Sequence, residues 1–457
     1  MFDLKGKKIL ILGAGKSGLS VAKFAIKQNP NEVILSDVKS KNKLSQEVIA
    51  LEKNGVILET DGHKDESFIH SDIIVISPGV PVLPKWLDIV KRNNKIFIGE
   101  IEFAYRFMKE YPIKIIAITG TNGKTTTTQL VYEILNNQLG EKVGLGGNIG
   151  KPFCDLLDDI KKYTYVVLEI SSFQLETIID FKPFISVILN ITDDHLDRYQ
   201  TMQAYAEAKA NIFRNQTQNE FLILNYDDRF TNIMISMAKC TKILFSAYNS
   251  LKDGYYVENE KFIKNVFGRK EELFSTKEVK LIGKHNQENI LASMIISDIL
   301  RMDFNKTKDV IKNFKGLSHR IEFSGEINGK KFYDDSKGTN IDAVIKAIKT
   351  FDDDLILILG GREKNTDFNQ LYNILPKNVK KIIAFGENKE KIQNIFKDKI
   401  KVVTASSMEE VIKKSLDEKD VKIVLFSPGC ASFDMYKNYE ERGNDFKRCV
   451  QKVAKNG

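Results

Sequence analysis

Residues 119–126, with the sequence TGTNGKTT, have the types and spacing needed to bind a phosphate chain. Glycines let backbone amides turn towards phosphate oxygens, and a helix that begins there adds a favourable dipole. Lys124 would reach the β- and γ-phosphates, and the Thr125 hydroxyl would bind magnesium. The position five residues before Gly123 holds Ile118, where the common phosphate-loop pattern has glycine. The segment therefore predicts a variant nucleotide-binding loop rather than the general kinase or GTPase form.

Side chains that could complete a metal and phosphate site follow two further predicted strands. Glu169 follows a strand over residues 165–168, and His195 comes after a strand over residues 185–189. A carboxylate at the C-terminal end of a strand beside a phosphate loop is well placed for magnesium. His195 could coordinate that metal or orient a substrate carboxylate, and a solvent-exposed histidine is the alternative. Lys209, on a predicted short helix, is not distinguished from other helical lysines by its position alone.

A second glycine-rich loop, residues 13–18 with the sequence GAGKSG, follows a predicted strand over residues 8–12. Asp37 ends the next strand, and this spacing matches a dinucleotide-binding fingerprint. The fingerprint itself indicates a bound pyrophosphate-like anion, so a nicotinamide or flavin oxidoreductase and a nucleotide-sugar diphosphate site both fit it. A structural glycine turn without a ligand is the third possibility.

Parallel sheets are needed to position these loops, and the hydrophobic pattern predicts three α/β units. Short apolar runs separated by helical or turn-rich stretches are typical of parallel strands with helical crossovers. We predict a Rossmann-like domain over residues 1–102, a P-loop-type ATPase domain with a parallel sheet over residues 103–316, and a Rossmann-like domain over residues 317–457. The remaining predicted elements are a helix over residues 286–299 and strands over residues 32–36, 56–59, 73–77, 96–98, 113–119, 221–224, 331–333, 355–359, 381–385 and 421–426.

Length, charge and cysteine content argue against several classes of protein. No apolar stretch approaches the ~20 residues of a membrane span, and the N-terminus lacks a signal-peptide core, so we predict a cytoplasmic protein. Four scattered cysteines without a CxxC pair favour structural thiols over disulfides or a zinc site. The net charge of +8 is spread along the chain. We therefore expect no nucleic-acid partner, and the lack of an apolar span argues against a membrane partner. We also expect a monomer that acts on small-molecule substrates.

The motifs, taken in order, resemble the muropeptide ligase family over essentially the full chain. The shared segments are TGTNGKT at 119–125, GNIG at 147–150, LEISS at 168–172, DHLD at 194–197, AK at 208–209, GKHN at 283–286 and HR at 319–320. The members that add D-glutamate to UDP-N-acetylmuramoyl-L-alanine are further similar in four stretches: SPGVP at 77–81, SSFQLE at 171–176, LGGREK at 359–364 and SPGCASFD at 427–434. The resemblance implies ATP-dependent amide-bond formation in peptidoglycan precursor synthesis.

The resemblance also implies roles for individual residues. Contacts to the UDP-linked substrate fall on Lys16, Ser17, Asp37, Lys39, Gly79, Asn148, Ser171 and Gln174. The first four of these, in the loops at 13–18 and 37–39, would line the uridine-diphosphate site. Contacts to ATP fall on Gly120, Thr121, Asn122, Gly123, Lys124, Thr125, Thr126, Asn286, Asn289, Arg320, Asp335 and Lys337. Magnesium, with two ions expected, would be held by Thr125, Glu169, His195 and Lys209, the last as a carbamylated lysine. Lys124, His195 and Lys209 are the implied catalytic residues.

In the third domain, the resemblance places D-glutamate against Thr339, Lys364, Ser432, Phe433 and Tyr439. A dicarboxylate needs cations and hydroxyl or backbone donors, which agrees with that set. Tyr439 stands where the family often has phenylalanine, and Lys39 where arginine is common. We expect the third domain to close over the site, since it brings the amino-acid contacts.

Two other functions explain fewer of these motifs. An oxidoreductase would account for residues 13–37 and leave the loop at 119–126 without a role. A nucleic-acid-stimulated ATPase would account for that loop and the net charge, but not for Lys364 and Ser432. An amide ligase that forms an acyl phosphate and then an amide explains the whole set.

Overall fold

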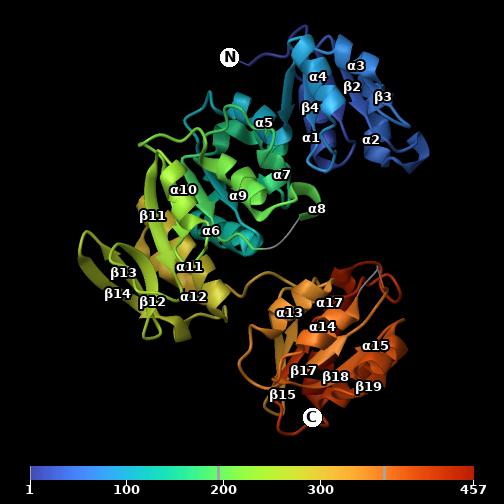
Figure 1. Ribbon diagram of the computed structural model, residues 1–457, viewed down its shortest axis with the longest axis vertical. Helices are drawn as coiled ribbons and strands as arrows, with labels where there is room; N and C mark the ends of the chain where they lie inside the picture. The colour runs from blue at the N-terminus through green and yellow to red at the C-terminus, as the bar shows by residue number, and fades with distance from the viewer. Residues whose placement is uncertain (1, 193–195, 364–366, 457) are drawn as a thin grey trace. The chain divides into compact units, whose positions relative to one another are not determined.

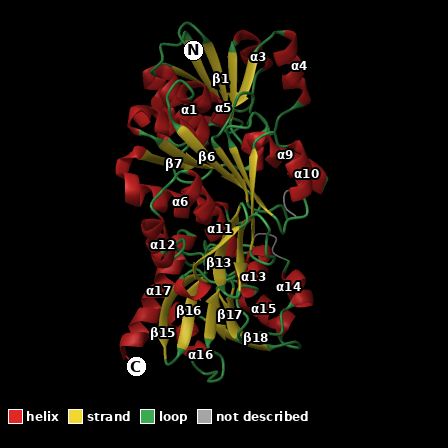
Figure 2. Cartoon of the chain, turned by 90° about the vertical axis from the view of Figure 1, so that its left-hand side faces the viewer, coloured by secondary structure: helices red, strands yellow, loops and turns green. Residues whose placement is uncertain are grey.

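The computed structural model describes residues 2–192, 196–363 and 367–456, and it contains three β-sheets flanked by helices (Figures 1 and 2). The three parallel-rich sheets confirm the predicted α/β class.

Contacts within the chain divide it into two compact units. Unit 1 comprises Met1–Glu278 and His285–Lys312 and holds the first two sheets; unit 2 comprises Val279–Lys284 and Asn313–Gly457 and holds the third. The predicted domain boundaries at residues 102 and 316 remain predictions.

Sheet A has five parallel strands in the order β3-β2-β1-β4-β5. Ile9 and Ile11 of β1 pack with Val21 of α1, whereas Leu10 packs on the opposite face with Phe68 of α3. Because alternate residues face opposite layers and helices cover both, the strands are apolar throughout. The elements are β1 (Lys8–Leu12), α1 (Lys16–Ile26), β2 (Glu32–Ser36), α2 (Gln46–Ala50), β3 (Val56–Glu59), α3 (Asp65–His70), β4 (Ile73–Ile76), α4 (Pro84–Arg92), β5 (Ile96–Gly99) and α5 (Glu100–Met108).

Sheet B has nine strands in the order β14-β13-β12-β11-β10-β9-β6-β8-β7. Its parallel part surrounds β6 and continues to β12, which pairs parallel with β11. The strands β13 and β14 then extend the edge through antiparallel pairings, and the sequence pattern predicted none of β12, β13 and β14. Phe267, at the turn between β13 and β14, is 93% exposed. The strands are β6 (Lys114–Thr119), β7 (Val143–Gly147), β8 (Tyr165–Glu169), β9 (Ile185–Ile188), β10 (Phe221–Asn225), β11 (Thr241–Ser246), β12 (Gly254–Glu258), β13 (Lys261–Val266) and β14 (Arg269–Ser275). The helices are α6 (Lys124–Leu139), α7 (Ser172–Leu175), α8 (Leu196–Tyr199), α9 (Met202–Ala210), α10 (Thr231–Met237), α11 (Lys284–Ile299) and α12 (Phe304–Asn313).

Sheet C has six strands in the order β15-β16-β20-β17-β18-β19, and β15 is the antiparallel one. Leu357 of β17 packs with Val344 of α13, while Ile358 packs on the other face with Val411 of α16 and Phe446 of α17. The elements are β15 (Glu322–Ile327), β16 (Lys330–Asp334), α13 (Ile341–Ile348), β17 (Leu355–Leu359), α14 (Phe368–Ile374), β18 (Val379–Phe385), α15 (Lys389–Phe396), β19 (Lys401–Ala405), α16 (Met408–Ser415), β20 (Ile423–Phe426) and α17 (Tyr439–Asn456).

Helix α5 joins the two sheets of unit 1 through a fully buried carboxylate. Glu102 accepts hydrogen bonds from the backbone N–H groups of Ile179, Asp180 and Phe181, at 2.9–3.0 Å, and from Nε of Arg106 at 2.8 Å. A buried charge is stable where ionic and backbone donors surround it in this way.

The four cysteine side chains are all buried, and burial raises the pKa of the Cys154 thiol.

Within the described ranges, the helices are too short or too polar for any of them to span a bilayer.

Candidate functional site

The loop at residues 119–126 links β6 to α6 and is braced by the loop after β9. Gly120 and Gly123 have φ angles of +153° and +83°, which residues other than glycine rarely adopt. Asn190 accepts a hydrogen bond from the Asn122 N–H at 2.8 Å and donates one to the Asn122 carbonyl at 3.1 Å. These hydrogen bonds tie the loop after β6 to the loop after β9.

Two lysine ammonium groups converge on this loop. Nζ of Lys124 donates to the carbonyls of Gly120 and Thr121, both at 2.8 Å. Nζ of Lys209, on α9, donates to the Gly120 carbonyl at 3.0 Å and lies 4.6 Å from the ring centre of Tyr205. Lys209 is 1% exposed. Two cations beside a helix N-terminus make a strongly anion-attracting environment. Thr125 and Thr126 lie, half-buried, in the first turn of the helix.

Glu169 has the arrangement expected of a cation ligand. It is the last residue of β8, 2% exposed, and its Oε1 accepts a hydrogen bond from Nδ2 of Asn148 at 2.8 Å. Among the described residues, no hydrogen-bond donor reaches Oε2. A buried carboxylate oxygen without a donor fits Mg²⁺, which prefers such hard oxygen ligands. His195, also predicted to hold magnesium, lies outside the described residues.

The predicted adenine contacts begin α11. Asn289 is buried, accepts a hydrogen bond from the Thr127 hydroxyl at 3.0 Å and donates one to Oδ1 of Asn286 at 3.1 Å. A Cβ atom at Gly123 would overlap with the Asn289 amide oxygen. Asn289 thus packs directly beneath the phosphate loop, a contact that the sequence pattern did not predict.

The first glycine-rich loop forms a second anion-binding candidate, at the carboxyl edge of sheet A. Asp37 accepts hydrogen bonds from the N–H groups of Ala14 at 2.7 Å and Lys39 at 2.9 Å. A Cβ atom at Gly18 would overlap with the Gly13 carbonyl, so only glycine allows α1 to start this close to the loop. The predicted contacts Lys16, Lys39 and Gly79 are exposed, and Ser17 is half-buried.

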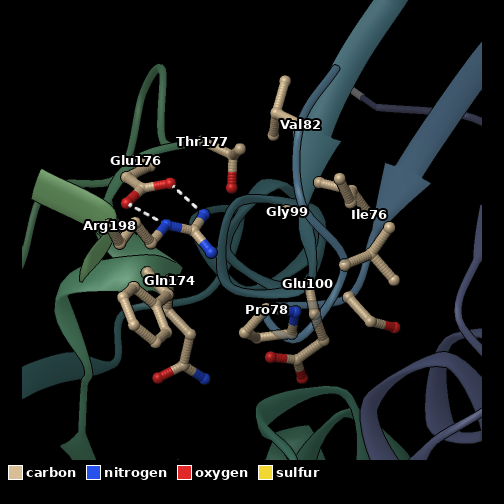
Figure 3. Close-up of a pocket in the computed structure, with 12 residues that line it drawn as sticks. Ile76, Pro78, Val82, Gly99, Glu100, Gln174, Glu176, Thr177 and Arg198 are labelled. Carbon is tan, nitrogen blue, oxygen red and sulfur yellow. Dashed lines mark hydrogen bonds and ion pairs between the residues drawn. The ribbon is translucent and has the colours of Figure 1, made fainter. Parts of the chain in front are cut away.

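A cavity in unit 1 lies between the loop after β4 and the segment around α7 (Figure 3). The predicted substrate residue Gln174 lines it, and Ser171 caps α7 by accepting the Gln174 N–H at 3.3 Å. Arg198 also lines it, with Nε and Nη2 donating to the two carboxylate oxygens of Glu176 at 3.1 and 2.5 Å, and with its guanidinium 4.3 Å from the ring centre of Phe173. Phe173 and Glu176 belong to the SSFQLE segment and Arg198 directly follows DHLD, but none of the three was predicted as a site residue.

Glu100 is a further lining residue without a sequence prediction. It is 2% exposed, and its Oε1 accepts the Cys154 N–H at 2.7 Å. Burial raises the pKa of Glu100 to about 7. Burial thus favours the protonated form, which can donate a hydrogen bond as well as accept one.

In unit 2, the predicted nucleotide contacts lie around the carboxyl end of β16. His319 and Ile321, on either side of the exposed Arg320, have φ angles of +66° and +48°. A β-branched residue at positive φ is strained, and such strain clusters at functional sites. Oδ2 of Asp335 accepts the Ser427 hydroxyl at 2.6 Å, and burial raises the pKa of Asp335 to about 7. Nζ of Lys337 lies 5.7 Å from the ring centre of Tyr439.

The predicted amino-acid contacts follow β16 and β20, which are neighbours in sheet C. Thr339 is exposed, Ser432 is 2% exposed and Phe433 is 52% exposed. The two loops are joined by a hydrogen bond from the Gly429 N–H to the Gly338 carbonyl at 2.8 Å. Unit 2 therefore brings Thr339, Ser432 and Phe433 to one edge of its sheet, and Tyr439 begins α17. Lys364 lies outside the described residues.

Three family comparisons cover most of the chain. Residues 7–99 match the family described as Mur ligase MurD-like, N-terminal domain. Residues 118–297 match the Mur ligase middle domain, and residues 319–430 match the Mur ligase, glutamate ligase domain.

Full-length relatives agree with these matches. The chain is 41% identical to the UDP-N-acetylmuramoylalanine–D-glutamate ligase of Thermoanaerobacter sp. (strain X514), over 99% of this chain and 100% of that protein. It is also 41% identical to the ligase of the same name from Clostridioides difficile (strain 630), over the same shares.

Solved structures show the same fold at lower identity. A MurF ligase from Thermotoga maritima, in complex with ADP, has a TM-score of 0.57 at 17% identity and covers 100% of both chains. The UDP-N-acetylmuramate-alanine ligase MurC from Thermotoga maritima has a TM-score of 0.56 at 18% identity, over 98% of this chain and 100% of that one.

Proposed function

This chain belongs to the Mur ligase family, and on that premise we propose that it uses ATP to join D-glutamate to UDP-N-acetylmuramoyl-L-alanine in peptidoglycan precursor synthesis. The observation that supports this most directly is the phosphate loop, where Lys124 and the buried Lys209 meet the Gly120 carbonyl. The curated relatives with this activity match the chain from end to end.

The nucleotide would bind along residues 120–126, with its base towards Asn286 and Asn289. Magnesium would be held by Thr125, Glu169, His195 and a carbamylated Lys209, with two ions expected. The orphan Oε2 of Glu169 supports this ligand set. Bound magnesium offsets negative charge on the phosphate oxygens.

The UDP part of the substrate would lie at the carboxyl edge of sheet A, against Lys16, Ser17, Asp37, Lys39 and Gly79. The rest of the substrate would reach the cavity of Figure 3, which Gln174 lines. Ser171, which caps α7, and Asn148, which donates to Glu169, would contact the substrate as well. In unit 2, Arg320, Asp335 and Lys337 would contact the ATP ribose and phosphates, and Thr339, Lys364, Ser432, Phe433 and Tyr439 would bind D-glutamate.

In the reaction, the L-alanine carboxylate attacks the γ-phosphate, ADP leaves, and an acyl phosphate remains on the substrate. The D-glutamate amine then attacks the acyl carbon, phosphate leaves, and the amide bond forms. Lys124 and the loop amides stabilise the negative charge that develops on the transferring oxygens. Holding three reactants together supplies much of the remaining acceleration.

An ADP-release assay tests the proposal directly. ADP should form when ATP, UDP-N-acetylmuramoyl-L-alanine and D-glutamate are all present, and mass spectrometry should find the dipeptide product. A panel of other amino acids, L-glutamate among them, measures the specificity for the incoming amine. Release of ADP without need for the UDP substrate, or a spectral change with a nicotinamide cofactor, would contradict the proposal. A cytoplasmic location and a monomeric state remain predictions from the sequence.

A further inference from the structure

A buried arginine in unit 2 connects the two loops that the proposed function assigns to ATP and D-glutamate. Arg442, in the first turns of α17, is 1% exposed. Its Nη2 donates to the Ser336 carbonyl at 2.9 Å and to the Cys430 carbonyl at 3.0 Å. Ser336 stands between Asp335 and Lys337, and Cys430 comes two residues before Ser432. One nitrogen atom therefore fixes the spacing between the loops at residues 335–340 and 427–433.

The guanidinium group also contacts a third loop. A Cβ atom built on Gly361, which follows β17, would lie 3.0 Å from Nη1 of Arg442. The backbone just after β17 thus lies against Nη1 of Arg442. The loops after β16, β17 and β20 all meet at this one side chain.

The donors of Arg442 are incompletely used. In the part of the chain that the structure describes, its Nε and Nη1 are buried and have no hydrogen-bond acceptor. Burial lowers the pKa of Arg442 to about 10, which still leaves it charged at neutral pH. A buried cation without a full set of acceptors is costly, and such costs persist mostly at functional sites. Packing alone would be achieved better by an apolar side chain of similar length.

The residue next to Arg442 extends the contact to the strained segment at Arg320. Cβ at Gly443 would overlap with the His319 ring, the Ser336 hydroxyl and the Asp334 carboxylate. Nδ1 of His319 lies 2.7 Å from Asp334, which accepts the Ser336 N–H at 2.9 Å. The start of α17 therefore supports both the nucleotide side and the amino-acid side of unit 2.

We propose that Arg442 is a positioning residue for amide-bond formation, which holds the loops at 335–340 and 427–433 in the one arrangement that presents the nucleotide contacts and the D-glutamate contacts of unit 2 together. The proposal rests on the proposed function. It extends that function to a residue that touches no substrate and acts through the backbone carbonyls of Ser336 and Cys430.

Kinetics of three full-length variants test it. Arg442→Met keeps an unbranched stem and removes the hydrogen-bond donors and the charge, whereas Arg442→Lys keeps a charged donor. Arg448→Met is the matched control on the same helix, where the side chain is 74% exposed. We expect Arg442→Met to raise KM for D-glutamate at least about tenfold and to lower kcat, with KM for the UDP substrate within about twofold of the wild type. Arg442→Lys should recover part of the loss, and Arg448→Met should match the wild type.

Hydrogen exchange provides a readout that does not depend on the substrate assignment. In Arg442→Met, the amides of residues 335–340 and 427–433 should exchange faster, while those of residues 120–126 should not change. Unchanged exchange in both loops, or unchanged KM for D-glutamate in a folded Arg442→Met protein, would overturn the positioning role. An equal rise in KM for all three substrates would indicate general destabilisation instead. A wild-type protein inactive with D-glutamate would overturn the proposed function, and the exchange data would still decide the role of Arg442.

Discussion

The phosphate loop in unit 1 and the paired loops in unit 2 are built in different ways. Residues 119–126 form one contiguous segment, and Lys124 donates to carbonyls three and four residues before it. The loops at 335–340 and 427–433 are held together by Arg442, which is 106 residues from Ser336. A substitution in the phosphate loop should therefore affect ATP alone. A substitution that disturbs the paired loops of unit 2 should affect both ATP and D-glutamate.

Removing the ammonium group from the phosphate loop should have the largest effect. Lys124→Ala should lower ADP release by about 1,000-fold, since it removes a cation that offsets developing charge. The melting temperature should stay within a few degrees of the wild type. The exposed Lys142→Ala provides a control in the same unit. If Lys124→Ala released ADP at the normal rate, the assignment of residues 119–126 to ATP would be wrong. The contrast between this loop and the paired loops of unit 2 would then fail as well.

Replacing the second lysine tests the predicted carbamate. Lys209→Ala should lose about 100-fold in activity, because a metal ligand and an anion-stabilising group are both removed. Short carboxylates such as formate or acetate should restore part of the rate by supplying oxygens in the vacated space. Full activity of Lys209→Ala without added carboxylate would count against a carbamate at this position.

A methyl group at the start of α17 should disturb both ligand sites of unit 2. Gly443→Ala should destabilise unit 2 by about 1–3 kcal/mol, because the added Cβ overlaps with His319 and Asp334. KM for ATP and for D-glutamate should rise together, in contrast to substitutions in the phosphate loop. Denaturant unfolding and kinetics measure the two effects, with the exposed Gln451→Ala on the same helix as control. If only one of the two KM values rose, the loops would not be coupled in this way.

The smallest expected effect is a change in how stability depends on pH. Burial raises the pKa of Asp335 to about 7, whereas an aspartate in an unfolded chain titrates near 3.9. Between these values the folded protein binds the extra proton, so stability falls as pH rises from about 4 to 7. Asp335→Asn should remove this part of the decline.

Melting temperatures at pH 5 and pH 8 measure that effect. The drop between the two should be smaller in Asp335→Asn than in the wild type, by about 2 °C or more. The exposed Asp352→Asn should behave as the wild type does. An identical drop in all three proteins would mean that Asp335 is ionised in the folded state across this range.

The strands could be predicted where both faces are covered. Leu355–Leu359 is apolar at every position and was predicted to the residue. The hairpin β13–β14 was missed because Arg269–Ser275 is mostly polar and exposed, so it lacks both an apolar run and a clear alternation. The parallel strands β7, β11 and β19 were missed as well, because glycines or exposed residues interrupt their apolar runs.

The site residues could likewise be predicted in one part and not in another. The phosphate loop was predicted because its residues are adjacent in sequence and their spacing has a direct chemical meaning. Arg442 was not, because the segment YEERGNDFKR has the charge pattern of a solvated helix, and its burial depends on contacts with Ser336 and Cys430 in distant loops. Glu100, Glu176 and Arg198 were missed for a similar reason, since the cavity that they line forms only when the two sheets of unit 1 meet.

The burial of all four cysteines makes the chain convenient for labelling experiments. Thiolates are the reactive form of cysteine, and enclosed thiols that stay protonated react slowly with maleimides. A cysteine introduced by Phe267→Cys, at the exposed turn between β13 and β14, would therefore react far ahead of the native ones. A fluorophore could be attached at residue 267 without first replacing any of the four native cysteines. The labelled position is far in sequence from the phosphate loop at residues 119–126.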